Sequence, residues 1–160
     1  MTREQFIHHV EGTQSAFRRF LCALCCGDRQ LADDIAQESY IKAWLSAGSI
    51  SDAAKFKSWL FRIGYNTFLN NMRAERHTVG YDEVRNVSAD DSADSEFRYQ
   101  ELYMALAGLP PKERTAVLLF YLEGYSVKEI AAMVDAGVDA VKQHLSRGRS
   151  HLRGILTAEN

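Results

Sequence analysis

The hydrophobic and polar positions of residues 109–156 recur with helical spacing and predict three consecutive helices. Pro110 and Pro111 open the first one, since proline suits a first turn whose N–H groups lack intrahelical partners. Apolar side chains surround nearly its whole circumference, which predicts a mostly buried helix that ends at Gly124. These side chains are Val117, Leu118, Phe120 and Tyr121.

Capping signals place the other two helices of this stretch. Ser126 with Glu129 three residues later forms a capping box and begins a short helix. A tight turn around Gly137 should follow, and Asp139 is a good N-cap for the last helix. The pattern is thus a short helix, a turn and a longer helix.

The last helix has an apolar stripe on one side and basic and small polar side chains on the other. The stripe consists of Val141, Leu145, Gly148, Leu152 and Ile155. The opposite side carries Gln143, Ser146, Arg147 and Ser150, with Lys142, Arg149 and Arg153 along one flank. No acid occurs from 140 to 153. This arrangement is typical of a DNA-binding helix-turn-helix. The alternative is a helical hairpin with a solvated basic face.

Three further helices are expected before residue 77. They cover residues 3–26 (with Gly12 as a candidate break), residues 28–45 with Asp28 as cap, and a long helix from a cap at Ser51 or Asp52 to about Arg76. The inner stripe of the first is Phe6, Val10, Phe17, Leu21 and Leu24, and that of the third is Phe56, Leu60, Ile63 and Thr67.

Two of these helices carry unusual outward faces. On the second helix, one face carries Asp33, Gln37, Tyr40 and Trp44. The adjacent face carries Asp34 and Glu38, and Glu38 is spaced to pair with Lys42. Acids that border large aromatic side chains favour a docking surface over a merely solvated acidic face.

The third helix carries an aromatic, amide and basic row. It consists of Trp59, Arg62, Asn66, Asn70 and Arg73. Such a row suits stacking on bases and hydrogen bonding to a single nucleic-acid strand. An ordinary basic surface is the alternative.

Composition fixes the class and the division of the chain. The scarcity of strand-like alternation predicts an all-α protein, and a net charge of −2 argues against a chain coated uniformly with nucleic acid. Residues 82–96 hold six acids and one base, and the whole stretch 77–97 has few large apolar groups, so we expect a flexible acidic linker there. Two small helical domains, 1–76 and 98–160, would then flank it.

Candidate chemistry other than binding is sparse. We recognise no nucleophile–base set, phosphate loop or metal motif, so we expect neither an enzyme nor a cofactor. No apolar run is long enough to cross a bilayer and no signal peptide is visible, which predicts a cytoplasmic protein without membrane insertion. The clustered Cys22, Cys25 and Cys26 could form a zinc site with His8 and His9 or sense redox state, but core packing is the simpler interpretation.

Three segments, 32–44, 57–76 and 109–153, resemble the extracytoplasmic-function family of bacterial RNA polymerase sigma factors. The resemblance covers nearly the whole chain, in order. It implies sigma domain 2 at 1–76, a linker at 77–97 that threads the polymerase, and sigma domain 4 at 98–160. It also implies a specificity subunit whose partners are core RNA polymerase (through the β′ clamp helices and the β flap), promoter DNA and an anti-sigma factor.

The resemblance further implies roles for individual residues. Asp34, Gln37 and Glu38 match the segment that docks on the β′ clamp helices. Trp59, Arg62, Asn66, Asn70 and Arg73 match the helix that melts and recognises the −10 element, and the loop at 49–53 sits where a flipped base is held. Lys142, Gln143, Ser146 and Arg147 match positions that face the −35 element, with Arg149 beside them.

The recognition helix departs from the family pattern at two places. Asp139-Ala140 stands where a small residue and Thr are usual, and His144 stands where Arg is common. The new carboxylate would oppose phosphate at that end of the helix, so the −35 sequence is expected to differ. Two rival functions remain at this stage: a regulator of the response-regulator type that binds DNA without polymerase, and a metal or redox sensor.

Overall fold

The structure is a computed structural model that describes residues 1–77 and 93–158 of the chain. Helices account for nearly all of these residues, and no strand occurs among them, which confirms the all-α prediction. The main helices are α1 (Arg3–Leu24), α2 (Arg29–Leu45), α3 (Phe56–His77), α4 (Ala93–Ala107), α5 (Pro111–Val117), α6 (Val127–Val134) and α7 (Val138–Ala158). Among the described helices, none is both long and apolar enough to cross a membrane.

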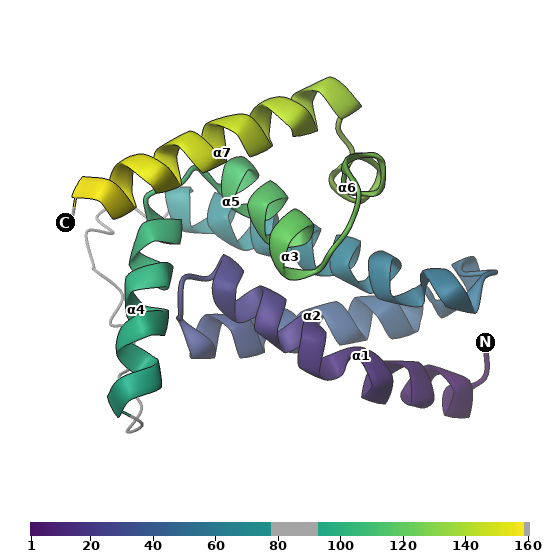
Figure 1. Cartoon of the computed structure of the whole chain (residues 1–160). Coiled ribbons are helices and arrows are strands. Elements are labelled where there is room, and N and C mark those ends of the chain that lie inside the picture. The colour runs from purple at the N-terminus through teal and green to yellow at the C-terminus, as the bar shows by residue number, and fades with distance from the viewer. Residues whose placement is uncertain (78–92, 159–160) are drawn as a thin grey trace.

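Helices α1, α2 and α3 pack around a core rich in phenylalanine, with α1 and α2 at the bottom and α3 across the middle of Figure 1. The Phe20 and Phe61 rings stack with their centroids 5.0 Å apart. Gly64 allows α1 and α3 to approach closely, because a Cβ at this position would lie 2.5 Å from Cε1 of Phe17. Large buried rings thus fix how α3 lies against α1.

Helix α1 runs without interruption, so the break considered at Gly12 is wrong. A capping box starts it, in which Gln5 N–H donates to Thr2 Oγ1 (3.2 Å) and Thr2 N–H donates to Gln5 Oε1 (2.9 Å). A mid-helix glycine costs only about 1 kcal/mol relative to alanine, which the packing of the flanking turns readily offsets. The predicted inner stripe faces the core, with Val10 half-buried and the other members buried.

The predicted caps of α2 and α3 are both formed by aspartates. Leu31 N–H donates to Asp28 Oδ1 (3.1 Å), as expected for the start of α2. Of the two candidates for the next helix, Asp52 accepts from Ala54 N–H (3.0 Å) and begins a short 3-10 turn, Ala53–Lys55, that leads directly into α3. Both caps are therefore at residues that the sequence predicts.

Helices α5, α6 and α7 form the upper layer in Figure 1. Ser126 and Glu129 make the predicted capping box at α6, with hydrogen bonds of 3.0 and 3.1 Å. Asp135, not Gly137, adopts the left-handed conformation that ends α6, with φ of 53°. Asp tolerates this conformation better than most residues with a Cβ. Helix α7 then begins at Val138, so Asp139 lies in its first turn and the predicted N-cap role is wrong.

The chain between α5 and α6 differs from the simple helix end that was predicted. Helix α5 continues as a π-helical stretch, Leu118–Leu122, before Gly124 turns the chain with φ of +76°. The apolar stripe of α7 packs on α5, as its spacing predicts, with Val141, Leu145 and Gly148 buried. The helix-turn-helix thus rests on α5.

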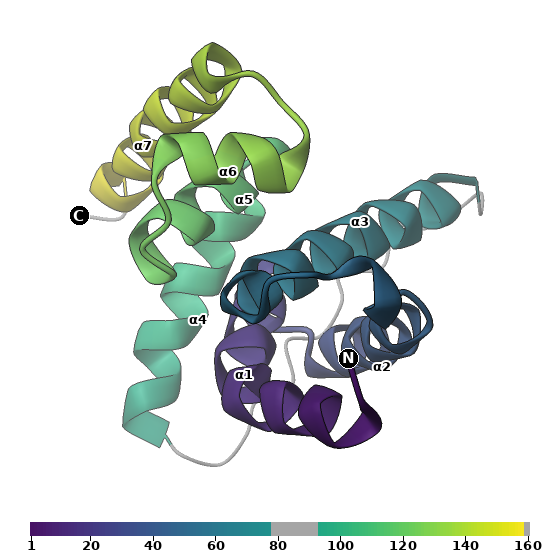
Figure 2. The same cartoon turned by 90° about the vertical axis from the view of Figure 1, so that its right-hand side faces the viewer.

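The α4–α7 group lies against the α1–α3 group, with α6 next to α3 (Figure 2). Helix α1 also contacts α4 and α5. The predicted linker, 77–97, lies mostly outside the described residues, and its last residues from Ala93 onwards belong to α4.

Candidate nucleic-acid interface

The outward face of α7 carries every residue predicted to face the −35 element. All five are exposed, namely Lys142, Gln143, Ser146, Arg147 and Arg149. The apolar stripe on the opposite side of the helix is buried at Val141, Leu145 and Gly148 and half-buried at Leu152 and Ile155. One helix face therefore presents an amide, a hydroxyl and cations with no carboxylate between them, which is the chemistry that base edges and phosphates require.

Tyr121 belongs to this surface, although its place in an apolar segment predicted that it would be buried. Its side chain is 56% exposed, and its hydroxyl accepts a hydrogen bond of 3.0 Å from Nη1 of Arg149. The uniform apolar character of the segment hid this role, because a tyrosine ring resembles a core residue in a hydrophobic pattern. Tyr121 thus fixes the direction of the Arg149 guanidinium on the outward face of α7.

The two residues of α7 that depart from the family pattern lie in different environments. Asp139 is exposed in the first turn of α7, where its carboxylate faces solvent. His144 is half-buried and lines a cavity of about 240 Å³ together with Tyr65 and Lys112. Burial, reinforced by the Lys112 charge, lowers the pKa of His144, so its imidazole is neutral near pH 7. A neutral ring at this position supplies no charge to DNA.

The predicted row on α3 also forms one surface. Arg62, Asn66, Asn70 and Arg73 are exposed along the helix, and Trp59 at its beginning is half-buried. The Trp59 ring packs against Phe56 with centroids 5.7 Å apart, which orients the indole. The amide and guanidinium groups thus follow an aromatic ring along one side of α3.

A cavity opens where this row begins. It measures about 460 Å³, within the usual range for small-molecule sites, and its walls include the loop at 49–52 together with Trp59 and Arg62. Its far wall comes from α6, through Glu129, Ala132 and Met133. The loop expected to hold a flipped base therefore lines a hollow of suitable size, next to an aromatic ring.

Helix α2 exposes the three polar residues that were predicted to dock on a partner, namely Asp34, Gln37 and Glu38. The Glu38–Lys42 ion pair expected at i, i+4 spacing is present at 3.3 Å. Lys42 Nζ also donates to Thr67 Oγ1 at 3.2 Å, which ties the charged face of α2 to α3. This surface is therefore held in place before any partner binds.

Apolar side chains extend the α2 surface beyond the residues that the sequence pattern singled out. Ile41 and Leu45 are 62% and 78% exposed. Trp44 is 45% exposed, and the centroid of its ring lies 5.1 Å from that of Phe6. Ile41 and Leu45 follow Asp34 and Glu38 at helical spacing, and this periodicity could have identified them. An acidic patch adjoining an exposed apolar patch is typical of a protein-binding surface.

The cysteines do not support the zinc alternative. Because α1 is continuous, Cys22 and His9 are separated by about 20 Å along the helix axis and cannot share a metal ion. Within residues 1–77 and 93–158, no group of three or more His, Cys, Asp or Glu side chains could hold a metal. Burial raises the pKa of the Cys22, Cys25 and Cys26 thiols, which disfavours the reactive thiolate.

Comparisons with known proteins agree with this geometry. The family models described as sigma-70 region 2 and sigma-70 region 4 match residues 10–78 and 99–152. The ECF RNA polymerase sigma factor SigW of Bacillus subtilis is 30% identical over 148 residues, covering 83% of this chain and 79% of SigW. SigM of Mycobacterium tuberculosis is 32% identical over 160 residues, covering 92% of this chain and 81% of SigM.

Solved structures share the fold. The sigma factor RpoE of Bartonella quintana, solved in complex with the anti-sigma factor NepR, superposes with a TM-score of 0.81 and 24% identity, covering 97% of this chain and 98% of RpoE. CnrH, solved in complex with the cytosolic domain of CnrY, gives a TM-score of 0.76 with 22% identity, covering 99% of this chain and 92% of CnrH.

The chain contains a helical unit with an aromatic, amide and basic row, followed by a helix-turn-helix. This combination defines a protein of the sigma-70 class. The identity to SigW and SigM over most of each chain goes further: the protein belongs to the ECF family of RNA polymerase sigma factors. It therefore directs promoter-specific initiation of transcription, a regulatory and non-catalytic role. The regulator of response-regulator type is not favoured, because it would not account for the match to sigma-70 region 2.

Proposed function

We propose that residues 1–76 act as sigma domain 2, that residues 98–160 act as sigma domain 4, and that the segment 77–97 connects them. The two family matches, at 10–78 and 99–152, support this division because they stop at nearly the same borders. The observation that carries the proposal is that three surfaces of different chemistry are exposed on three separate helices, α2, α3 and α7.

Helix α7 recognises the −35 element. Gln143 can pair with both hydrogen-bonding groups of an adenine edge, while Lys142 and Arg149 contact phosphates. Ser146 and Arg147 complete the base-facing side. The carboxylate of Asp139 repels phosphate at the start of the helix, so the protein prefers a −35 sequence different from that of relatives with a hydroxyl there.

Helix α3 recognises the −10 element and assists melting. Trp59 stacks on an unpaired base, the amides of Asn66 and Asn70 bond to base edges, and Arg62 and Arg73 hold the backbone of the single strand. The cavity beside the loop at 49–52 accepts a flipped base. The supporting observations are the exposure of the polar members of this row and the size of the cavity.

Helix α2 docks on the β′ clamp helices of core polymerase through Asp34, Gln37 and Glu38. The exposed Ile41 and Leu45 lie beside these residues and supply apolar contact area. The C-terminal domain contacts the β flap, which sets the spacing between the two promoter elements. Because polymerase holds both domains, weak individual contacts combine into tight promoter binding.

The partners of two structural neighbours suggest how the protein is regulated. RpoE was solved with the anti-sigma factor NepR, and CnrH with the cytosolic domain of CnrY. We infer that this protein too is held inactive by an anti-sigma factor. It acts in the cytoplasm, where core polymerase and promoter DNA are found, and the chain itself performs no enzymatic step.

The docking role of α2 is tested by the double substitution Asp34→Ala with Gln37→Ala. Both side chains are exposed, so the midpoint of unfolding should change little. Loss of contacts worth about 3 kcal/mol in total should weaken binding to core polymerase roughly a hundredfold in a pull-down or anisotropy titration. Glu4→Ala, which removes an exposed carboxylate from α1, serves as the control. Undiminished polymerase binding by the folded double variant would show that this face is only a solvated surface.

A further inference from the structure

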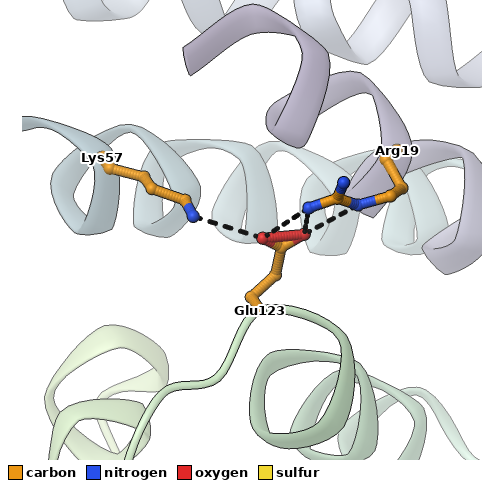
Figure 3. A network of polar contacts seen from close by, with 3 residues as sticks. All are labelled: Arg19, Lys57 and Glu123. Atoms are coloured by element: carbon orange, nitrogen blue, oxygen red, sulfur yellow. Dashed lines mark hydrogen bonds and ion pairs between the residues drawn. The ribbon is translucent and has the colours of Figure 1, made fainter. Parts of the chain in front are cut away.

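A glutamate from the C-terminal helical group lies between two cations of the N-terminal group (Figure 3). Both carboxylate oxygens of Glu123 accept from Arg19 Nη2, at 3.0 and 3.2 Å, and Arg19 Nε donates to Oε1 at 3.3 Å. Lys57 Nζ lies 3.4 Å from Oε2 of the same carboxylate. One acid thereby links the loop before α6 to both α1 and α3.

Lys57 also contacts aromatic rings on both sides of the interface. Lys57 Nζ lies 5.5 Å from the centre of the Phe61 ring on α3, and 5.7 Å from that of Tyr125 across the interface. The Glu123 side chain is fully shielded from solvent, whereas Arg19 and Lys57 keep 54% and 38% of their side-chain exposure. The cations can therefore be approached by a second anion while Glu123 is still bound.

This ion-pair cluster lies at the first turns of α3, where the row also begins. Lys57 precedes Trp59 by two residues, so the two side chains leave the helix on different sides. On the other side of Trp59, the cavity at the loop 49–52 is closed by α6, and Arg62 Nη1 approaches the carbonyl oxygen of Ala132 at 3.5 Å. In this arrangement the C-terminal group covers the start of the surface that would stack on unpaired bases.

A guanidinium fork with a neighbouring ammonium binds a carboxylate and a phosphate diester by the same geometry. We propose that Arg19 and Lys57 form a phosphate-binding site for single-stranded promoter DNA, which Glu123 occupies from within the chain. Glu123 then acts as a latch: it holds α6 over Trp59 and Arg62, and a DNA phosphate replaces it when the two groups separate. The proposal rests on the DNA-binding role of the α3 row and adds to it two cations and an internal competitor.

The test is binding of a fluorescein-labelled mixed-sequence single-stranded DNA to the free full-length protein at low salt, measured by anisotropy. Glu123→Gln removes the competing charge and should raise affinity about tenfold, because more of the protein then occupies the open, binding-competent state. Glu101→Gln makes the same change in net charge at an exposed position of α4 and should alter affinity less than about twofold. Equal affinities of the two variants would overturn the latch.

A second pair of substitutions separates the phosphate site from mere opening. Adding Arg19→Ala and Lys57→Ala to Glu123→Gln should return the affinity to the wild-type level or below. The slope of log affinity against log salt should also become shallower by about 0.7 for each phosphate that these cations no longer neutralise. An affinity that stays at the Glu123→Gln level would refute the phosphate site. Glu123 lies in a loop, so circular dichroism should be unchanged, and Glu123→Ala should behave in the same way.

The same variants distinguish this inference from the proposed docking function. Glu123→Gln leaves Asp34 and Gln37 untouched, so its binding to core polymerase should equal that of the wild type. Loss of the latch effect with intact polymerase binding would contradict only the inference. Loss of polymerase binding in the α2 double variant would leave the latch measurement unaffected, since that assay contains no polymerase.

Discussion

Arg114 is a buried cation whose removal should destabilise the protein strongly. The residue is 8% exposed, and its guanidinium donates to three carbonyl oxygens: Nη1 to Leu24 (2.8 Å), Nε to Leu106 (2.9 Å) and Nη2 to Leu109 (3.0 Å). Leu24 is the last residue of α1, whose final carbonyls have no intrahelical partner. The guanidinium therefore joins the end of α1 to the α4–α5 connection.

The expected loss of stability follows from the hydrogen-bond acceptors that Arg114→Met would leave without the guanidinium. The Leu106 carbonyl still accepts from Leu109 N–H at 3.0 Å, so it remains satisfied. The Leu109 carbonyl loses its guanidinium donor, and the Leu24 carbonyl keeps only the weak Cys26 Sγ donor at 3.8 Å, so the cost is at most about 1–3 kcal/mol each. Relief of the buried charge offsets part of this cost. We expect a net loss of about 3 kcal/mol in the free energy of unfolding, or roughly 6–12 °C in Tm for a chain of this size.

Urea denaturation followed by two probes measures this loss. Both tryptophans, Trp44 and Trp59, lie in the α1–α3 group, whereas circular dichroism reports every helix. Arg114→Met should shift the circular dichroism transition more than the fluorescence transition. Arg149→Met removes an exposed cation and should change stability by about 0.5 kcal/mol at most. A shift of less than about 0.5 kcal/mol for Arg114→Met would refute the role of its guanidinium in joining the two helical groups.

Two further predictions concern helix α7. Gln143→Ala should weaken binding of the polymerase-bound protein by about 1–3 kcal/mol only for promoters that carry the preferred base at one −35 position; uniform weakening across single-base promoter variants would exclude base recognition. Gly148→Ala should destabilise the protein by about 1–2 kcal/mol in urea titrations, because the new Cβ would lie 2.8 Å from Cγ2 of Val117. Gly154→Ala in the same helix meets nothing within 4 Å and should be neutral or stabilising, so equal effects of the two would argue against close packing of α5 and α7.

The helices and the outward faces of this protein follow from local rules that act within a few residues. Apolar spacing and a side-chain cap depend only on neighbours along the chain, which is why the Asp28 cap, the Ser126–Glu129 capping box and the outward face of α7 were predicted. The start of α7 was predicted slightly too late, because Asp139 is a favoured N-cap residue type while the helix already begins at Val138.

Features that depend on contacts across the fold were not accessible in this way. Tyr121 looks like a core residue until its hydroxyl is seen beside Arg149. Glu123 and Arg19 are separated by 104 residues, and nothing in the local pattern of either indicates the other. Arg114 likewise appears in the sequence as one more cation near the start of a helix, although it is buried against the end of α1. Such pairs become visible only when the helices are placed together.

The central claim is that this protein gives core RNA polymerase its promoter specificity. The direct measurement is in vitro transcription of a promoter-containing template library by bacterial core polymerase, with and without the purified protein, followed by sequencing of transcript 5′ ends. We predict that the protein creates a set of defined start sites that share one −35 and one −10 sequence, and that the Asp34→Ala, Gln37→Ala variant abolishes them. Start sites that do not depend on the protein, together with tight binding of the free protein to duplex promoter, would contradict the assignment.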